Sequence, residues 1–102
     1  MDLDFKIVGN DICVKLTGEI DEYTARSLRD DLDKLIDAQG FRSMTLDMQS
    51  VTFIDSTGFG LIIGRYKKLR QKRAELLLKN VPPQVDKVFR TSGLYSFVPI
   101  VK

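Results

Sequence analysis

The chain contains no histidine, and cysteine occurs only once, at Cys13. The absence of histidine removes the commonest general base and the commonest metal ligand of proteins. A single cysteine cannot form a disulfide within the chain, which suits a reducing cytosol. We therefore expect no enzyme, no cofactor and no metal centre, and we interpret Cys13, which lies between Ile12 and Val14, as a buried structural thiol.

Long apolar runs and a strong charge of either sign are also lacking. No stretch approaches the roughly 20 apolar residues of a membrane-spanning helix, and the longest candidate, residues 59–63, is interrupted by Gly60. The first residues are acidic and carry no secretory signal. The net charge of +2 neither demands nor excludes an anionic partner. We expect a soluble, cytoplasmic protein without a membrane segment.

The composition that remains is that of a globular domain, with 43% hydrophobic and 29% charged residues in a chain of 102. Apolar periodicity and turn residues predict the order β-β-α-β-α-β-α-β, an α/β fold with a mixed sheet and helices packed against it. We expect one domain over residues 1–102. The predicted strands are residues 5–8, 12–16, 44–48, 76–78 and 97–101, with 51–54 leading into a turn, and the predicted helices are 22–38, 57–73 and a third that Pro82 and Pro83 open and Gly93 ends.

The most informative stretch is residues 54–60, where a buried strand ends and an amphipathic helix begins. A hydroxyl at Ser56 or Thr57 would face solvent beside the positive end of the helix dipole, which suits a phosphate. Asp55, Ser56 and Thr57 are also ordinary helix-capping residues, so the pattern leaves both interpretations open. A phosphate on Ser56 would carry about −1.5 to −2 charge. It would leave the fold intact and act on a docking partner.

Two enzymatic or nucleotide-binding interpretations fit this stretch poorly. A nucleophilic serine elbow needs glycine two residues before Ser56, where Ile54 stands, and a histidine that the chain lacks. Gly58, Gly60 and Gly64 resemble a dinucleotide fingerprint, but the third interval is one residue too long and no acid follows the next strand. We expect instead that Gly60 and Gly64 let the helix lie close on the sheet.

The charged residues mostly predict solvated helix faces. Nucleic-acid binding would need more positive charge and exposed aromatic rings, and Tyr66 is better placed for the core, so we expect no direct nucleic-acid partner. No carboxylate spacing matches a calcium loop. Asp21 follows a strand end, where it or Thr24 could cap the next helix and where Asp21 could face the Ser56 turn. The basic residues assigned to a solvated face are Arg65, Lys67, Lys68, Arg70, Lys72 and Arg73.

Residues 55–60, Asp-Ser-Thr-Gly-Phe-Gly, followed by Gly64-Arg65-Tyr66, resemble the signature of bacterial anti-sigma factor antagonists. These are STAS domains that control sporulation and stress sigma factors. Residues 16–21 are similar to the family's strand-to-helix corner, residues 51–56 to its central motif and residues 92–94 to its late turn. The resemblance covers essentially the whole chain.

The resemblance implies a phosphorylation switch. The unphosphorylated antagonist would bind an anti-sigma factor that is also a serine kinase using ATP and Mg²⁺, and binding would free the sigma factor. The kinase would then phosphorylate Ser56, with Thr57 as the second choice of acceptor, and a PP2C-type phosphatase would restore the free serine. Asp21, Asp55, Ser56, Thr57 and Gly58 would form the partner-binding surface.

Two other classes of function remain open. One is a STAS scaffold without a phosphate cycle, as a subunit of a stressosome or of a lipid-transport complex. The other is a small-molecule binder or enzyme that uses the glycine turn as an anion site. Isolation in a stable assembly would favour the first, and nucleotide binding lost on Gly58→Val would favour the second.

Overall fold

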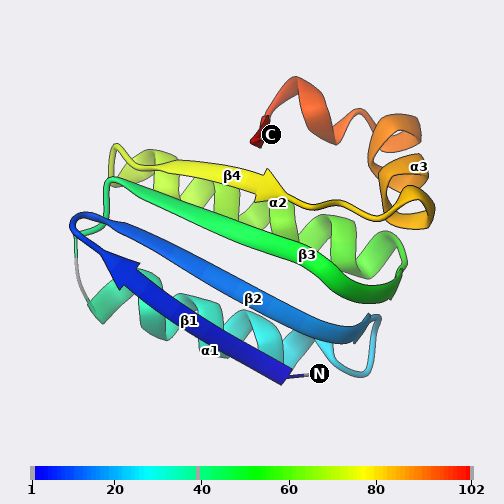
Figure 1. Cartoon of the computed structure of the whole chain (residues 1–102), viewed down its shortest axis with the longest axis horizontal. Helices are drawn as coiled ribbons and strands as arrows, with labels where there is room; N and C mark the ends of the chain where they lie inside the picture. Colours follow the sequence, from blue (N-terminus) through cyan, green and yellow to red (C-terminus); the bar gives the residue numbers. More distant parts are fainter. Residues whose placement is uncertain (1, 39, 102) are drawn as a thin grey trace.

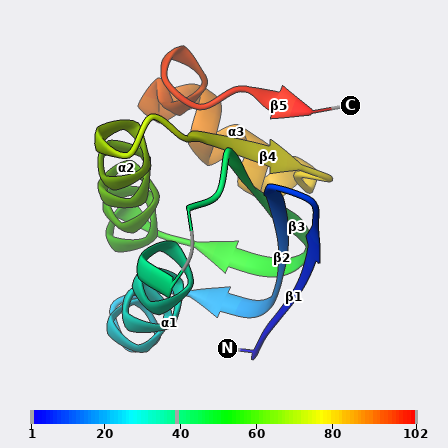
Figure 2. The same ribbon diagram turned by 90° about the vertical axis from the view of Figure 1, so that its left-hand side faces the viewer.

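The computed structural model describes residues 2–38 and 40–101, which form a five-stranded sheet of order β1-β2-β3-β4-β5. β1 (Asp2–Val8) runs antiparallel to β2 (Asp11–Ile20), whereas β3 (Ser43–Ile54), β4 (Glu75–Lys79) and β5 (Ile100–Val101) continue the sheet in parallel. α1 (Ala25–Ala38) and α2 (Ser56–Gln71) cover one face, and α3 (Pro83–Ser92) lies beyond the carboxyl end of β4 (Figures 1 and 2). The predicted element order and mixed α/β sheet are confirmed.

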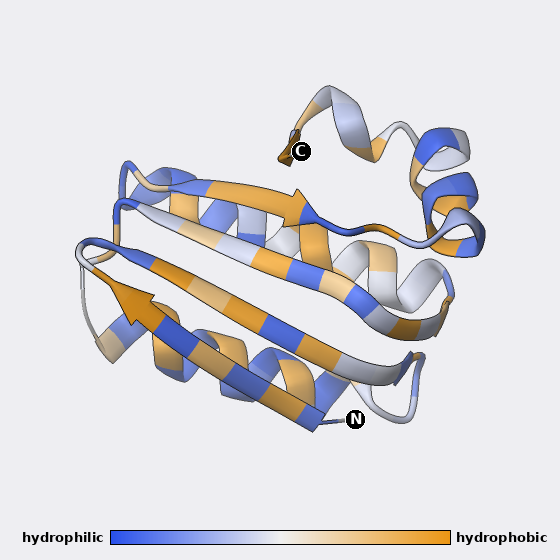
Figure 3. Ribbon diagram, viewed as in Figure 1, coloured by the Kyte–Doolittle hydropathy of each residue, from blue (hydrophilic) through white to orange (hydrophobic). Residues whose placement is uncertain are grey.

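The core lies between the sheet and the two helices that cover it. Apolar and polar residues alternate along β1 and β2 (Figure 3), so Ile12, Val14 and Leu16 all point toward the helices and are at most 1% exposed. Cys13 points to the opposite face and is half-buried, so the prediction of a buried thiol is wrong. Tyr66 packs only at the margin of the core.

Several element boundaries differ from the prediction. β3 is one strand of 12 residues that leads directly to the key turn. The last strand begins at Ile100 and not at Phe97, because residues 94–98 form a helical turn in which the amides of Phe97 and Val98 donate to the Leu94 carbonyl. That turn includes the short 3-10 helix η1 (Leu94–Ser96). α3 ends as predicted at Gly93, which adopts a left-handed φ of 78°.

Part of the basic run joins the two helices instead of facing solvent. Arg65 is only 11% exposed, with its Nε 3.0 Å from Asp33 Oδ1. Lys68 Nζ lies 3.0 Å from Asp37 Oδ2, and Lys72 Nζ lies 3.4 Å from Asp37 Oδ1. The Lys68 hydrogen bond lowers the pKa of Asp37. The prediction of a solvated face is therefore wrong for these residues, because opposite charges on α1 meet them.

Candidate functional site

Ser56 is positioned by the parallel pairing of β2 and β3. Ile20 and Ile54 are paired at the ends of these strands, and the Asp55 amide donates to the Ile20 carbonyl at 3.2 Å. Asp21 and Asp55 therefore leave the sheet side by side at the same end. The chain then enters α2 at once, with Ser56 as its first residue.

Asp55 caps the helix that Ser56 begins. Its backbone is extended, at φ −114° and ψ −171°, and its Oδ1 accepts from the amides of Thr57 at 2.9 Å and Gly58 at 3.1 Å. One carboxylate thus satisfies two of the free amides of the first turn. The capping role that the sequence left open among three residues belongs to Asp55. The side chains of Ser56 and Thr57 are both exposed.

The two neighbouring hydroxyls line different pockets. Ser56 lines a pocket of about 440 Å³ between α2 and α3, here called the α2–α3 pocket. Thr57 lines a pocket of about 690 Å³ between α1 and α2, the α1–α2 pocket, together with Arg26, Arg29 and Arg65. The α2–α3 pocket is lined by Ile54, Asp55, Ser56, Phe59, Lys87, Val88, Thr91 and Ser92.

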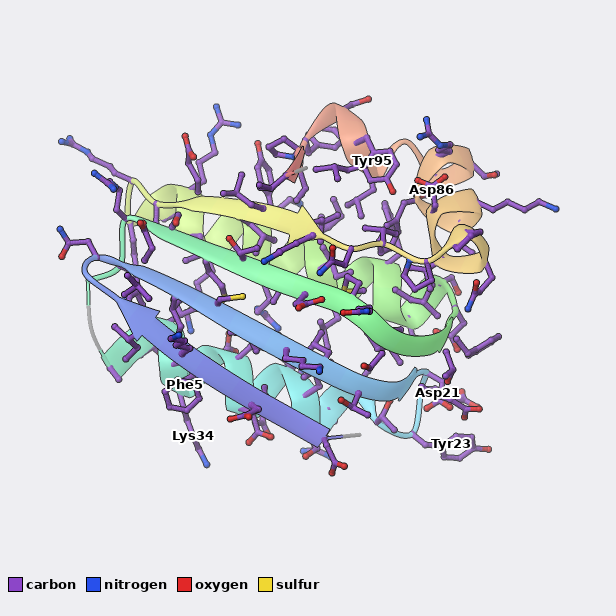
Figure 4. All side chains as sticks on the ribbon, viewed as in Figure 1. Phe5, Asp21, Tyr23, Lys34, Asp86 and Tyr95 are labelled. Atoms are coloured by element: carbon purple, nitrogen blue, oxygen red, sulfur yellow. The ribbon has the colours of Figure 1, made fainter. Side chains whose placement is uncertain are left out.

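Sequence reasoning missed the α3 residues of the α2–α3 pocket. α3 buries Val85 and Phe89, and Val88, three positions after Val85, is partly buried on the same side of the helix and lines the pocket. The apolar spacing of α3 predicts that Val88 packs inward, but it does not predict that Val88 meets the start of α2. A cluster of Asp86, Arg90 and Tyr95 holds the neighbouring 3-10 helix against α3 (Figure 4 labels Asp86 and Tyr95).

Asp86 is bound by two donors. The Tyr95 hydroxyl donates to its Oδ1 at 2.6 Å, and Arg90 Nε donates to its Oδ2 at 2.7 Å. The Tyr95 hydrogen bond, with that of Arg90, lowers the pKa of Asp86. Burial and the same Tyr95 hydrogen bond raise the pKa of Tyr95. The contacts fix η1 on α3, the helix that forms one wall of the α2–α3 pocket.

Gly58 is the glycine that brings α2 close to the sheet. A Cβ at this position would lie 2.5 Å from Ile54 Cγ1 and 2.7 Å from Ile20 Cγ2. A Cβ at Gly60 or Gly64 would meet nothing within 4 Å. The prediction that Gly60 and Gly64 allow the close approach is therefore wrong. Gly58 has that role because it lies in the first turn of α2, soon after β3 ends at Ile54, and its Cα faces the sheet.

Asp21 lies at the predicted end of the sheet, but its hydrogen bonds go to its own turn. Its Oδ1 accepts from the amides of Tyr23 at 2.9 Å and Thr24 at 3.1 Å, and the Asp21 amide donates to the Thr24 hydroxyl at 3.0 Å. Both candidate caps thus act together, and α1 begins at Ala25. This turn presents Tyr23, which is 86% exposed and projects from the same end of the molecule (Figure 4).

Metal ligation and membrane crossing find no support in the part of the chain that the structure describes. Within residues 2–38 and 40–101, no three His, Cys, Asp or Glu side chains come together as a metal site. None of the described helices has the length and hydropathy needed to cross a bilayer. What the site offers is an exposed hydroxyl, a capped helix start and an apolar pocket beside them.

Comparisons with known proteins agree with this geometry. The model of the STAS domain family matches residues 2–102. An anti-sigma F factor antagonist of Paenibacillus polymyxa is 35% identical over 87% of this chain and 76% of its own length, and an anti-sigma-B factor antagonist of Bacillus subtilis is 33% identical over 98% and 90%. The structure of the anti-sigma factor antagonist SpoIIAA in its unphosphorylated form superposes with a TM-score of 0.83 at 25% identity, covering 99% of this chain and 89% of that one. The chain therefore belongs to the STAS domain family.

Proposed function

We propose that this protein is an anti-sigma factor antagonist that phosphorylation of Ser56 switches off. The observation that carries the proposal is that different residues cap α2 and present a hydroxyl at its start. Asp55 caps the helix, which leaves the Ser56 hydroxyl exposed at the edge of the α2–α3 pocket. The names of the relatives, anti-sigma F and anti-sigma-B factor antagonist, support the same function.

The unphosphorylated form binds the anti-sigma factor through the end of the sheet where β2 and β3 finish. The docking surface contains Asp21, Asp55, Ser56 and Thr57 around the buried Gly58, and we extend it to the α3 wall of the α2–α3 pocket and to Tyr23. Exposed aromatic rings are typical anchors at protein interfaces, and Tyr23 follows Asp21 by two residues. The anti-sigma factor releases its sigma factor when it is bound at this surface.

Phosphorylation acts on the interface and leaves the fold unchanged. A phosphate on Ser56 lies beside the amino terminus of α2, where the helix dipole stabilises negative charge. In the complex, the same phosphate would have to lose its water against the apolar side chains of Ile54, Phe59 and Val88. The partner consequently dissociates while the antagonist stays folded.

Ser56 is a better acceptor for this switch than Thr57. Thr57 lines the α1–α2 pocket, where Arg26 and Arg29 would neutralise a phosphate through charge-assisted hydrogen bonds. Ser56 lines the α2–α3 pocket, and Lys87 is the one cationic residue among those that line it. A phosphate on Ser56 therefore keeps more of its charge exposed to the docking partner.

The cycle needs two enzymes other than this chain. The anti-sigma factor acts as the serine kinase with ATP and Mg²⁺, a PP2C-type phosphatase removes the phosphate, and both meet the antagonist in the cytoplasm. The chain itself is the substrate and not the catalyst, since histidine is absent from its sequence and Asp55 is committed to the helix cap.

The test is a phosphorylation reaction with the anti-sigma factor of the same genome, ATP and Mg²⁺, followed by intact-mass and fragment spectra. One phosphate on Ser56 is expected, and Ser56→Ala should bind the partner without accepting phosphate. Ser56→Asp should lose binding with an unchanged Tm. A phosphate on Thr57 would correct the acceptor. No phosphate, together with a complex that survives ATP, would contradict the cycle and favour a stressosome or lipid-transport subunit.

A further inference from the structure

β1 is an open edge of the sheet. It stands at the end of the strand order, with β2 on one side, and its register with β2 is continuous over all seven residues. Phe5, Ile7 and Val8 are 48%, 42% and 64% exposed. Soluble proteins usually protect an edge strand with proline, a bulge, charged side chains or a covering helix or loop. This strand has no proline and no bulge, and the charges at its centre, Asp4 and Lys6, have opposite signs.

The two faces of β1 differ in character. Leu3, Phe5 and Ile7 stand opposite buried residues of β2 and so point to the helix side of the sheet. α1 lies on this side of the sheet (Figure 2), but Leu3 is only partly buried, and Phe5 and Ile7 remain exposed. Figure 4 shows Phe5 directed toward the side of α1. Asp4 and Lys6 lie on the other face, which the described helices do not cover.

The free backbone groups of β1 belong to the apolar row. β1 and β2 are joined by the two-residue turn Gly9-Asn10, with Val8 and Asp11 as the closing, hydrogen-bonded pair. Hydrogen-bonded pairs alternate along an antiparallel ladder, so the N–H and C=O groups of Leu3, Phe5 and Ile7 point away from β2. In agreement, the Phe5 amide donates to Asp4 Oδ1 at 2.9 Å.

We propose that two copies of this chain pair through β1, antiparallel and about a two-fold axis at Phe5. In this register Phe5 opposes Phe5 of the second copy, and Leu3 opposes Ile7, so that the free backbone groups bond to each other. Asp4 of each copy opposes Lys6 of the other. The strand sequence is therefore complementary to itself, as an isologous interface requires.

The charges on β1 favour this register over its neighbours, because it contains no like-charged pair. A shift by two residues in one direction keeps two opposite-charge pairs, between Asp2 and Lys6, but places Asp4 opposite Asp4. A shift in the other direction places Lys6 opposite Lys6. Like charges directly opposite each other destabilise an antiparallel pair. A shift by one residue would turn the apolar row away from the helix side and would lose the backbone match.

The paired strands would extend the sheet and bury the exposed apolar row. The rows of the two copies meet on the helix side, between the two α1 helices. The α2–α3 pocket stays open in the dimer, because α3 lies near the other edge of the sheet (Figure 1). The inference does not depend on the proposed function.

The test measures self-association by sedimentation equilibrium for the wild type, Asp4→Lys and Lys6→Asp. The wild type should form a concentration-dependent dimer, and each variant should dissociate about tenfold more readily, since both opposite-charge pairs become like-charge pairs. An equal mixture of the two variants should recover the dimer, because the two lysines of one chain then oppose the two aspartates of the other. Lys15→Asp is the matched control, since Lys15 opposes Asp4 within the chain and lies outside the interface.

Two results would overturn the proposal. One is a wild type that stays monomeric at all concentrations, and the other is a mixture that associates no better than either variant alone. If the variants fail to fold, a second measurement on the wild type alone still tests the pairing. Amide hydrogen exchange at Leu3, Phe5 and Ile7 should slow as the protein concentration rises, and exchange independent of concentration would also refute the pairing.

Discussion

Replacing Gly58 with alanine tests how closely α2 sits on the sheet. The added Cβ would lie 2.5 Å from Ile54 Cγ1 and 2.7 Å from Ile20 Cγ2, well inside van der Waals contact. Both atoms are branch positions on side chains that are 4% and 0% exposed. They cannot move aside without displacing the core, so the amino terminus of α2 must shift away from the strand ends.

The magnitude follows from two opposing effects. Overpacking of a buried position costs up to about 3 kcal/mol, and alanine in a helix is favoured over glycine by about 1 kcal/mol. The free energy of unfolding of Gly58→Ala should therefore fall by about 2 kcal/mol. In a domain of this size, that loss lowers the Tm by about 10 °C.

Gly64→Ala is the matched control. Its Cβ would meet nothing within 4 Å, so only the helix preference remains and stability should rise by up to about 1 kcal/mol. Both variants would be measured by thermal and urea unfolding. If Gly58→Ala were as stable as Gly64→Ala, the close packing of α2 against Ile20 and Ile54 would be refuted.

Three further perturbations address the cap, α3 and the docking surface. Asp55→Ala should lower the free energy of unfolding by about 1 kcal/mol through loss of the helix cap, measured by urea unfolding, and Asp55→Asn should retain most of it. Tyr95→Phe should raise the pKa of Asp86 toward its usual value, measured by NMR titration. Because the pKa of Asp86 is lowered in the folded protein, its stabilising contribution is present above about pH 4 and is lost as the pH falls through the lowered pKa. The difference in free energy of unfolding between Tyr95→Phe and the wild type should therefore disappear in acid. Tyr23→Ala should weaken anti-sigma factor binding by about tenfold in calorimetry with an unchanged Tm, and an unchanged affinity would remove Tyr23 from the docking surface.

Local pattern was enough to predict the element order and the place of the functional turn. The apolar period of two or 3.6 residues identified the four longer strands and the helices, and Gly93 marked the end of α3 as expected. The short β5 was misjudged because residues 94–98 satisfy their backbone groups locally. A few residues with apolar side chains fit either a strand or a helical turn, and sequence periodicity cannot distinguish them.

The errors about charge and glycine arose from tertiary contacts. Arg65 and Lys68 look like solvent-facing residues until α1 is placed beside α2, where Asp33 and Asp37 meet them. Gly58 could have been chosen over the later glycines, because it precedes the buried residues Leu61 and Ile62 by three and four positions and so shares their face. The α2–α3 pocket depends on how α3 docks, which no local pattern reports.

The start of α2 separates stability from recognition at adjacent residues. Asp55 and Gly58 face inward, one by accepting two backbone amides and the other by allowing close contact with Ile20 and Ile54. Ser56 and Thr57 lie between them with exposed side chains. A change of charge at either hydroxyl therefore meets the helix dipole and solvent, and neither the cap nor the packing has to break. The two hydroxyls line different pockets, so the same added charge has a different effect on a partner at each position. A phosphorylation switch requires both properties: a fold that the added charge does not disrupt and a binding surface that it does.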